Sequence, residues 1–178
     1  MTFEELSLPG AYLITLERIE DARGFNARAW CAREFEEAGL PIRISQVNVI
    51  HNVHRGTLRG MHYQTPPMAE TKLFRVTSGR IHDVIVDLRP ESATYGRWTS
   101  VELSADEPQL LFVPEQFGQG FQTLEDDTQL TYQVSEFFSP DHGAGFRYDD
   151  PAFAIEWPLD VTVISAKDES WPPFEARP

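Results

Sequence analysis

The residues best suited to chemistry gather around His62, in the segment RGTLRGMHYQ (55–64). Beside the histidine this segment holds two arginines, two glycines, a tyrosine and a glutamine. Histidine is the side chain that most readily takes up a proton near neutral pH, and such dense polar groups in a β domain suggest the wall of a pocket. The alternative is a strand histidine whose hydrogen bonds are satisfied within the fold. The local sequence leaves both interpretations open.

The other histidines are weaker candidates than His62 for a functional role. They are His51, His54, His82 and His142. We interpret His82 as a structural residue of a strand and His142 as part of a surface loop. A metal site needs several histidine or carboxylate ligands that converge. His-Tyr-Gln at 62–64 supplies one ligand where a His-X-His pair would supply two, and no other cluster has ligand spacing. We therefore expect no metal and no other cofactor.

Lys72 and Tyr132 are the next candidates. Lys72 opens a predicted strand and could stabilise an oxyanion, although the sequence alone favours a solvated strand end. Tyr132 lies in the middle of LTYQ and is either a core residue or an acid. A histidine base usually needs a carboxylate that fixes its tautomer, but the sequence alone pairs none with His62. It contains no nucleophile elbow, P-loop or dinucleotide fingerprint.

Gln119 stands between two glycines in FVPEQFGQGF (112–121). Glycine permits sharp turns and close approach of other groups to the backbone. Gln119 therefore either points into a pocket or belongs to a tight turn.

Short segments rich in Val, Thr, Phe and Tyr predict an all-β fold, either a sandwich or a double-sheet jelly roll. The predicted strands lie at 72–88 (two runs around a turn at Ser78–Gly79), 97–104, 109–113, 120–124, 129–138 and near Val161 to Ser165. A helix is expected from Arg28 to Gly39, with Trp30, Phe35 and Ala38 near one face.

Composition limits the partners. The 178 residues fit one domain, 1–178, and the 41% hydrophobic and 24% charged residues are typical of a globular chain. A net charge of −13 argues against nucleic acid and against an anionic membrane surface. A single cysteine, Cys31, excludes a disulfide framework. With neither a signal peptide nor a membrane span in the sequence, we expect a cytoplasmic protein.

Several long motifs resemble the dTDP-4-dehydrorhamnose 3,5-epimerase family. They are RGTLRGMHYQ, TKLFRV, DVIVDLRPESATYGRW, VPEQFGQGF, TYQ, RYDDPAFAIEWP and VISAKD, and the resemblance runs from about Pro9 to Trp171. It implies a cupin-type jelly-roll double-sheet barrel with a short N-terminal helix, usually a metal-free homodimer. The substrate it implies is a nucleoside diphosphate carrying a 4-keto-6-deoxy sugar. The implied reaction removes the proton on C3, C5 or both and forms an enolate.

The resemblance also assigns roles. His62 matches the base, Asp168 the carboxylate that orients it, Lys72 the enolate-stabilising lysine and Tyr132 the acid that returns the proton. Substrate contacts are expected from Arg23 and Arg59 (diphosphate), Gln46, Asn48, Lys167 and Phe138, which stands where a base-stacking tyrosine is common.

Three positions depart from the family pattern. Arg28 and Gly143 stand where glutamates are common, and Gln119 replaces a substrate-contacting histidine. We therefore expect an altered substrate, nucleotide or number of inverted carbons, including a mono-epimerase on a CDP- or GDP-linked sugar. Two alternatives stay open, namely a non-catalytic cupin that binds a nucleotide sugar or a protein partner, and a ketoisomerase that moves the carbonyl between C4 and C3.

Overall fold

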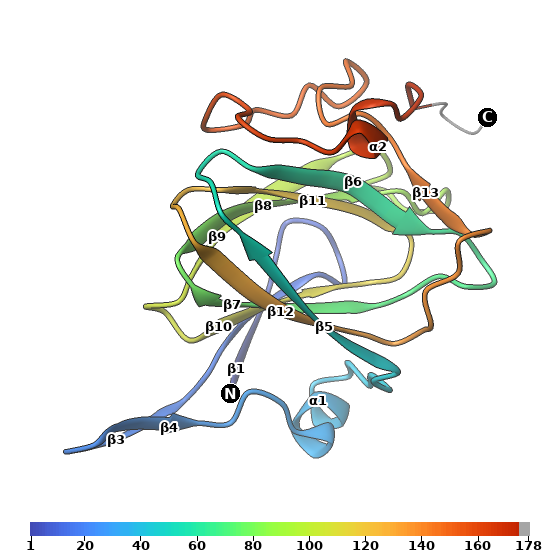
Figure 1. Cartoon of the computed structure of the whole chain (residues 1–178). Helices are drawn as coiled ribbons and strands as arrows, with labels where there is room; N and C mark the ends of the chain where they lie inside the picture. The colour runs from blue at the N-terminus through green and yellow to red at the C-terminus, as the bar shows by residue number, and fades with distance from the viewer. Residues whose placement is uncertain (175–178) are drawn as a thin grey trace.

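The computed structural model describes residues 1–174, and two antiparallel β-sheets face one another (Figure 1). The first sheet has the order β1 (Thr2–Glu5), β2 (Tyr12–Thr15), β10 (Gln109–Val113), β7 (Lys72–Ser78), β12 (Thr128–Val134), β5 (Gln46–Asn52). The second has the order β13 (Gly143–Gly145), β6 (Leu58–Gln64), β11 (Phe117–Thr123), β8 (Arg80–Asp87), β9 (Trp98–Ser104). The all-β expectation is confirmed.

Alternation along the strands explains why the sheets stack. On β8, Ile81 and Ile85 point between the sheets, and they meet Phe74 of β7 and Leu130 of β12 in the main core. Successive side chains of a strand point to opposite faces, so Val84 of β8 lies in a different apolar cluster on the outer face. The C-terminal segment, drawn in orange and red, covers that outer face (Figure 1).

A short helix packs on the other side of the molecule. It is α1 (Ala32–Glu37), and it buries Phe35 completely. The predicted range of 28–39 was too long at both ends, and Trp30, expected on the buried face, is 38% exposed. Gly39 ends the helix in the left-handed region with φ +74°, where glycine carries no Cβ penalty. The second helix, α2 (Ala166–Glu169), has Ser165 as its N-cap.

Two features differ from the sequence prediction. The strand expected near residues 161–165 is one isolated parallel bridge between Thr57 and Val163. A two-stranded hairpin of β3 (Arg18–Asp21) and β4 (Gly24–Ala27) projects from the body of the molecule (Figure 1). Within residues 1–174, neither helix has the length and apolar character to cross a membrane.

Candidate active site

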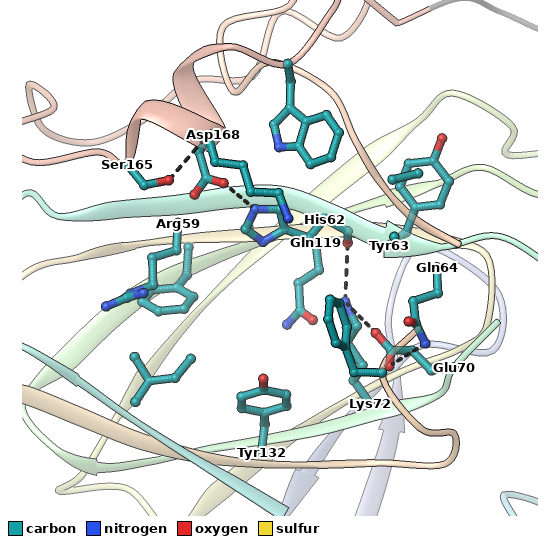
Figure 2. Close-up of a pocket in the computed structure, with 18 of the residues that line it drawn as sticks. Arg59, His62, Tyr63, Gln64, Glu70, Lys72, Gln119, Tyr132, Ser165 and Asp168 are labelled. Carbon is teal, nitrogen blue, oxygen red and sulfur yellow. Dashed lines mark hydrogen bonds and ion pairs between the residues drawn. The ribbon is translucent and has the colours of Figure 1, made fainter. Parts of the chain in front are cut away.

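A cavity of about 390 Å³ opens between the two sheets. Its wall combines side chains from β6 and β11 of one sheet, β7 and β12 of the other, and the C-terminal segment around α2. Figure 2 shows His62 and Asp168 on one side of the cavity and Tyr132 on the other. Residues far apart in the sequence thus converge on one space.

His62 pairs with Asp168. His62 Nε2 lies 2.6 Å from Asp168 Oδ1, although 106 residues separate the two in sequence. Asp168 is held on α2 by its backbone N–H, which donates to Ser165 Oγ at 3.1 Å, and its Oδ2 accepts from the backbone N–H of Gly60 at 3.4 Å. Burial raises the pKa of Asp168, but the hydrogen bond and charge of His62 outweigh it and leave the pKa below its usual value. A carboxylate bound at Nε2 leaves Nδ1 as the nitrogen able to accept a proton.

The cavity wall depends on a close approach of β6 and β11. A Cβ on Gly60 would lie 2.5 Å from Gly120 Cα, so this crossing has no room for a side chain. Gln119 faces His62 in the register of these strands. It lies within β11 rather than in a turn, it is 3% exposed, and it lines the cavity. The flanking glycines therefore serve strand packing.

Lys72 lies nearly buried at the start of β7. Its Nζ donates to the backbone carbonyl of His62 at 3.2 Å and lies 3.6 Å from Glu70 Oε1. Burial lowers the pKa of Lys72, and the carboxyls of Glu70 and Asp83 counteract it. Burial also raises the pKa of Glu70, against the charge of Lys72. An ammonium in this setting is poorly solvated and interacts strongly with any negative charge that forms beside it.

Tyr132 enters the cavity from β12. Its ring stacks on Phe74 with centroids 4.9 Å apart and planes tilted by 16°. Burial, followed by the charge of Glu70, raises the pKa of its hydroxyl. The phenol therefore stays protonated at neutral pH and is able to donate a proton. It lies on the sheet opposite the one that carries His62.

Asp83 does not line the cavity and lies behind Gln119, which does and which we call the cavity floor. It is fully buried on β8, and Gln119 Nε2 donates to its Oδ1 at 3.1 Å and its Oδ2 at 3.0 Å. Burial raises the pKa of Asp83 to about 8, with Gln119 and Lys72 acting in the opposite direction.

The candidate substrate contacts divide into two groups. Arg59, Lys167 and Phe138 line the cavity, and the Phe138 side chain is 62% exposed. Gln46 and Asn48 do not line it. Gln46 Oε1 accepts from the backbone N–H of Phe138 at 2.8 Å and so supports that rim indirectly.

Arg23 and Arg28 lie outside the cavity. Arg23 sits on the β3–β4 hairpin, where its side chain is 89% exposed and pairs with Asp21 at 2.6 Å. Arg28 pairs with Glu34 at 2.8 Å. The third departure, Gly143, does line the cavity.

Sequence reasoning missed two cavity residues that organise this site. Glu70 stands two positions before Lys72, so both side chains project to the same face of an extended chain. Gln64 is buried, donates to Met68 O at 2.9 Å, and accepts from the backbone N–H of Ser139 at 2.7 Å. It also donates to Glu70 Oε2 at 3.2 Å, which ties Glu70 to the rim that carries Phe138. The spacing of Glu70 was readable from the sequence, whereas the contacts of Gln64 were not.

Among the described residues, no group of three or more His, Cys, Asp or Glu side chains is arranged to hold a metal ion. The site instead combines a carboxylate-paired imidazole, a buried ammonium and a protonated phenol around one cavity. In a two-sheet fold, such a set is chemically able to remove and return protons and to stabilise an oxyanion between the two steps.

Comparison with known proteins assigns the chain to a family. The family model of dTDP-4-dehydrorhamnose 3,5-epimerase matches residues 5–176, so the chain belongs to this family and is a carbohydrate epimerase. It is 40% identical to dTDP-4-dehydrorhamnose 3,5-epimerase of Methanothermobacter thermautotrophicus, over 99% of this chain and 96% of that protein. The crystal structure of the Bacillus anthracis enzyme with TDP and PPi bound superposes with a TM-score of 0.95 at 38% identity, covering 97% of this chain and 99% of the other. A dTDP-4-dehydrorhamnose 3-epimerase of Streptomyces niveus is 33% identical over 95% of this chain and 82% of its own length.

Proposed function

We propose that this protein inverts C3, C5 or both in a nucleoside-diphosphate 4-keto-6-deoxy sugar, with His62 as the base. The observation that carries the proposal is the His62–Asp168 pair, which faces Lys72 and Tyr132 across one cavity. The C4 ketone acidifies the protons on C3 and C5, so a histidine can remove them.

The chemistry follows from the positions of the four side chains. Nδ1 of His62 takes the carbon-bound proton, and Asp168 stabilises the imidazolium that forms. The electron pair of the broken C–H bond forms the C3–C4 or C4–C5 double bond, and the former carbonyl pair moves to the C4 oxygen. Lys72 stabilises that oxyanion. Tyr132 then donates its phenolic proton to the same carbon from the opposite side, so the configuration inverts. Solvent exchange restores both groups.

The rest of the substrate extends toward the rim. The diphosphate is assigned to Arg59 and Lys167, which both line the cavity. The nucleobase is assigned to the exposed ring of Phe138. Asn48 and Gln46 do not line the cavity, so their proposed roles are indirect. Asn48 lies opposite Tyr132 in the register of β5 and β12, and Gln46 supports the Phe138 backbone.

The chain is further proposed to work as a homodimer built from single-domain protomers, 1–178, of the cupin-type jelly-roll class. The β3–β4 hairpin carries Arg23 away from its own cavity and exposes Ile19 and Phe25, at 69% and 49%. Val47 and Val49 of β5 are also more than 60% exposed. A partner that covers these apolar groups and receives Arg23 in its cavity explains both features.

Complementation tests the dimer. Arg23→Ala and His62→Ala, each nearly inactive alone, should regain activity when unfolded together and refolded, because mixed dimers contain one intact site. Absence of recovery in a preparation that contains mixed dimers would place Arg23 outside the partner's cavity.

Deuterium exchange tests the reaction. The protein is incubated in deuterated water with dTDP-, CDP- and GDP-linked 4-keto-6-deoxy sugars, and exchange at C3 and C5 is followed by NMR. Exchange should be lost in His62→Ala and retained in His54→Ala, an exposed histidine outside the cavity. If the wild type binds a nucleotide sugar but exchanges neither proton, the protein is a non-catalytic cupin. Movement of the carbonyl to C3 in the product would indicate a ketoisomerase.

The nucleotide and the number of inverted carbons are separate questions. Gln119 and Gly143 alter the cavity wall where the family usually has His and Glu, and the 3-epimerase relative is a family member named for a single carbon. Mono-epimerisation, or preference for a CDP or GDP sugar, is the second candidate. Efficient exchange at both carbons of the dTDP sugar alone would exclude it.

A further inference from the structure

Asp83 and Gln119 are buried polar residues under the cavity floor. If Asp83 is an ionised carboxylate, the two side chains do not satisfy all of their hydrogen bonds. Asp83 is 0% exposed and Gln119 is 3% exposed. Both oxygens of Asp83 receive the same donor, Gln119 Nε2. Gln119 Oε1 is buried and has no partner among the described residues. A buried acceptor without a donor costs about 1–3 kcal/mol, so a missing donor is expected here.

A proton on Asp83 supplies that donor. An ionised carboxylate at this depth would be a buried charge whose direct partner is one neutral amide, which is unfavourable. Lys72 acts on Asp83 through its charge, but its ammonium lies 3.6 Å from a different carboxylate, that of Glu70. Consistently, burial raises the pKa of Asp83 to about 8 even against the opposing effects of Gln119 and Lys72.

We propose that Asp83 holds a proton at neutral pH and forms with Gln119 an uncharged acid–amide pair beneath the cavity. The hydroxyl of Asp83 donates to Gln119 Oε1, and the other carboxyl oxygen accepts from Nε2. A small rotation of the amide brings these atoms opposite one another, and the second hydrogen of Nε2 is left over. The three oxygens of the pair, and one hydrogen of the amide, then each have a partner.

The pair has a consequence for Lys72. With Asp83 neutral, the ammonium has one anionic neighbour, Glu70, instead of two, so it is better able to stabilise a new negative charge on the substrate. Asp83 is thus a positioning residue that acts through Gln119 and Lys72. This step rests on the proposed function, in which the C4 oxyanion forms beside Lys72.

Other ionisable or charged groups lie near the pair and must be separated from it. They are Lys72 on β7, Glu70 before it, His62 and Arg59 on β6 and Tyr132 on β12, which line the same cavity, and Glu102 on β9, which acts on His82 at the opposite face of β8. A rate profile alone therefore does not identify Asp83, and the proton must be observed directly.

Infrared spectroscopy of the full protein in deuterated water, without substrate, observes it. At pH about 6 the wild type should show the carbonyl band of a protonated buried carboxylic acid, and the band should fade as the pH rises through about 8. The band should be absent in Asp83→Asn and retained in Glu70→Gln. A band that survives in Asp83→Asn, or no band in the wild type, overturns the proposal.

Kinetics gives a second readout. Asparagine has the shape and the donor–acceptor pattern of the neutral acid, so Asp83→Asn should fold and keep proton exchange within about threefold near pH 7. A loss of about tenfold or more, or failure to fold, means that the charge of Asp83 is needed and contradicts the proposal. If no nucleotide sugar exchanges with the wild type, the proposed function fails, whereas the infrared band still decides the state of Asp83.

Discussion

Asp83 and Asp87 are both fully buried on β8, four residues apart and on the same face, yet their environments drive them in opposite directions. Burial raises the pKa of Asp83 to about 8. For Asp87, burial acts the same way, but donors from Arg89, Ser92 and Thr94 outweigh it and lower the pKa to about 2. Burial alone therefore does not determine whether a carboxyl is charged.

The donors explain the difference. Arg89 contacts Asp87 through Nε at 2.9 Å and Nη2 at 2.7 Å, and two hydroxyls add bonds of 2.6 Å each. Asp87 thereby anchors the loop between β8 and β9, outside the cavity. Asp83 has one neutral amide as its donor, beside the cavity in which the proposed reaction forms an oxyanion. A full set of donors stabilises a charge for structure, and a sparse set keeps a carboxyl neutral near the active site.

The largest effect should come from Asp87→Ala. It leaves the Arg89 guanidinium and two hydroxyls without their acceptor, so the free energy of unfolding should fall by about 3 kcal/mol. Urea denaturation measures the change. Glu91→Ala, an exposed carboxylate in the same loop, serves as the control and should cost under about 0.5 kcal/mol. A similar small cost for Asp87→Ala would mean that its hydrogen bonds contribute little.

The pH dependence of stability should separate the two aspartates. Asp87 has a lowered pKa, so its contribution is present above about pH 4 and is lost as the pH falls toward 2. Asp83 has a raised pKa, so its contribution is present below about pH 4 and is lost as the pH rises through about 8. Asp83→Asn should therefore gain stability relative to the wild type between pH about 5 and about 9, by at most about 1.4 kcal/mol per pH unit. Denaturation of the wild type and of Asp83→Asn at pH about 5 and about 9 measures this difference. If the free energy of unfolding changes equally in the two proteins between these pH values, Asp83 is ionised throughout.

Glu70→Gln tests whether Glu70 is the one anionic neighbour of Lys72. If Asp83 is neutral, this change removes the one anionic neighbour of Lys72 and lowers its pKa further, because Glu70 counteracts the effect of burial. Exchange at C3, measured by NMR near pH 7, where Asp83 still holds its proton, should then fall by about tenfold and recover at lower pH. Glu115→Gln, an exposed position outside the cavity, is the control. An unchanged profile for Glu70→Gln would indicate that an ionised Asp83 replaces it.

Local patterns in the sequence predicted the strands best. The run QLLFV was expected at 109–113 and forms β10 over the same residues, because a short apolar run bounded by polar residues suits a buried strand. Ser78–Gly79 was expected to be a turn, and Gly79 indeed has φ +74° between β7 and β8. The strand prediction near Val163 was wrong, because alternation alone does not supply a partner strand. Val163 forms an isolated bridge with Thr57.

The candidate site depended on contacts that no local pattern records. The polar residues around His62 suggested it as a site residue, but Asp168 lies 106 residues away and was assigned only through the family resemblance. Arg23 was assigned in the same way, and its position outside its own cavity depends on how the β3–β4 hairpin projects. Asp83 carries no local signal, because its state is set by burial and by Gln119 across a β8–β11 pairing.

Gln119→His should have the smallest effect on stability and the most specific effect on chemistry. An imidazole can become positive near neutral pH, which an amide cannot, so it would pair with an ionised Asp83 and remove the acid band described above. Fold stability should change by less than about 1 kcal/mol, while the ratio of C3 to C5 exchange should change by about threefold or more. NMR of the exchanged sugar measures the ratio, and Gln129→His, outside the cavity on β12, is the matched control. If the acid band persists and the ratio is that of the wild type, the residue at 119 sets neither the charge of Asp83 nor the choice of carbon, and the difference between the two aspartates has no role in catalysis.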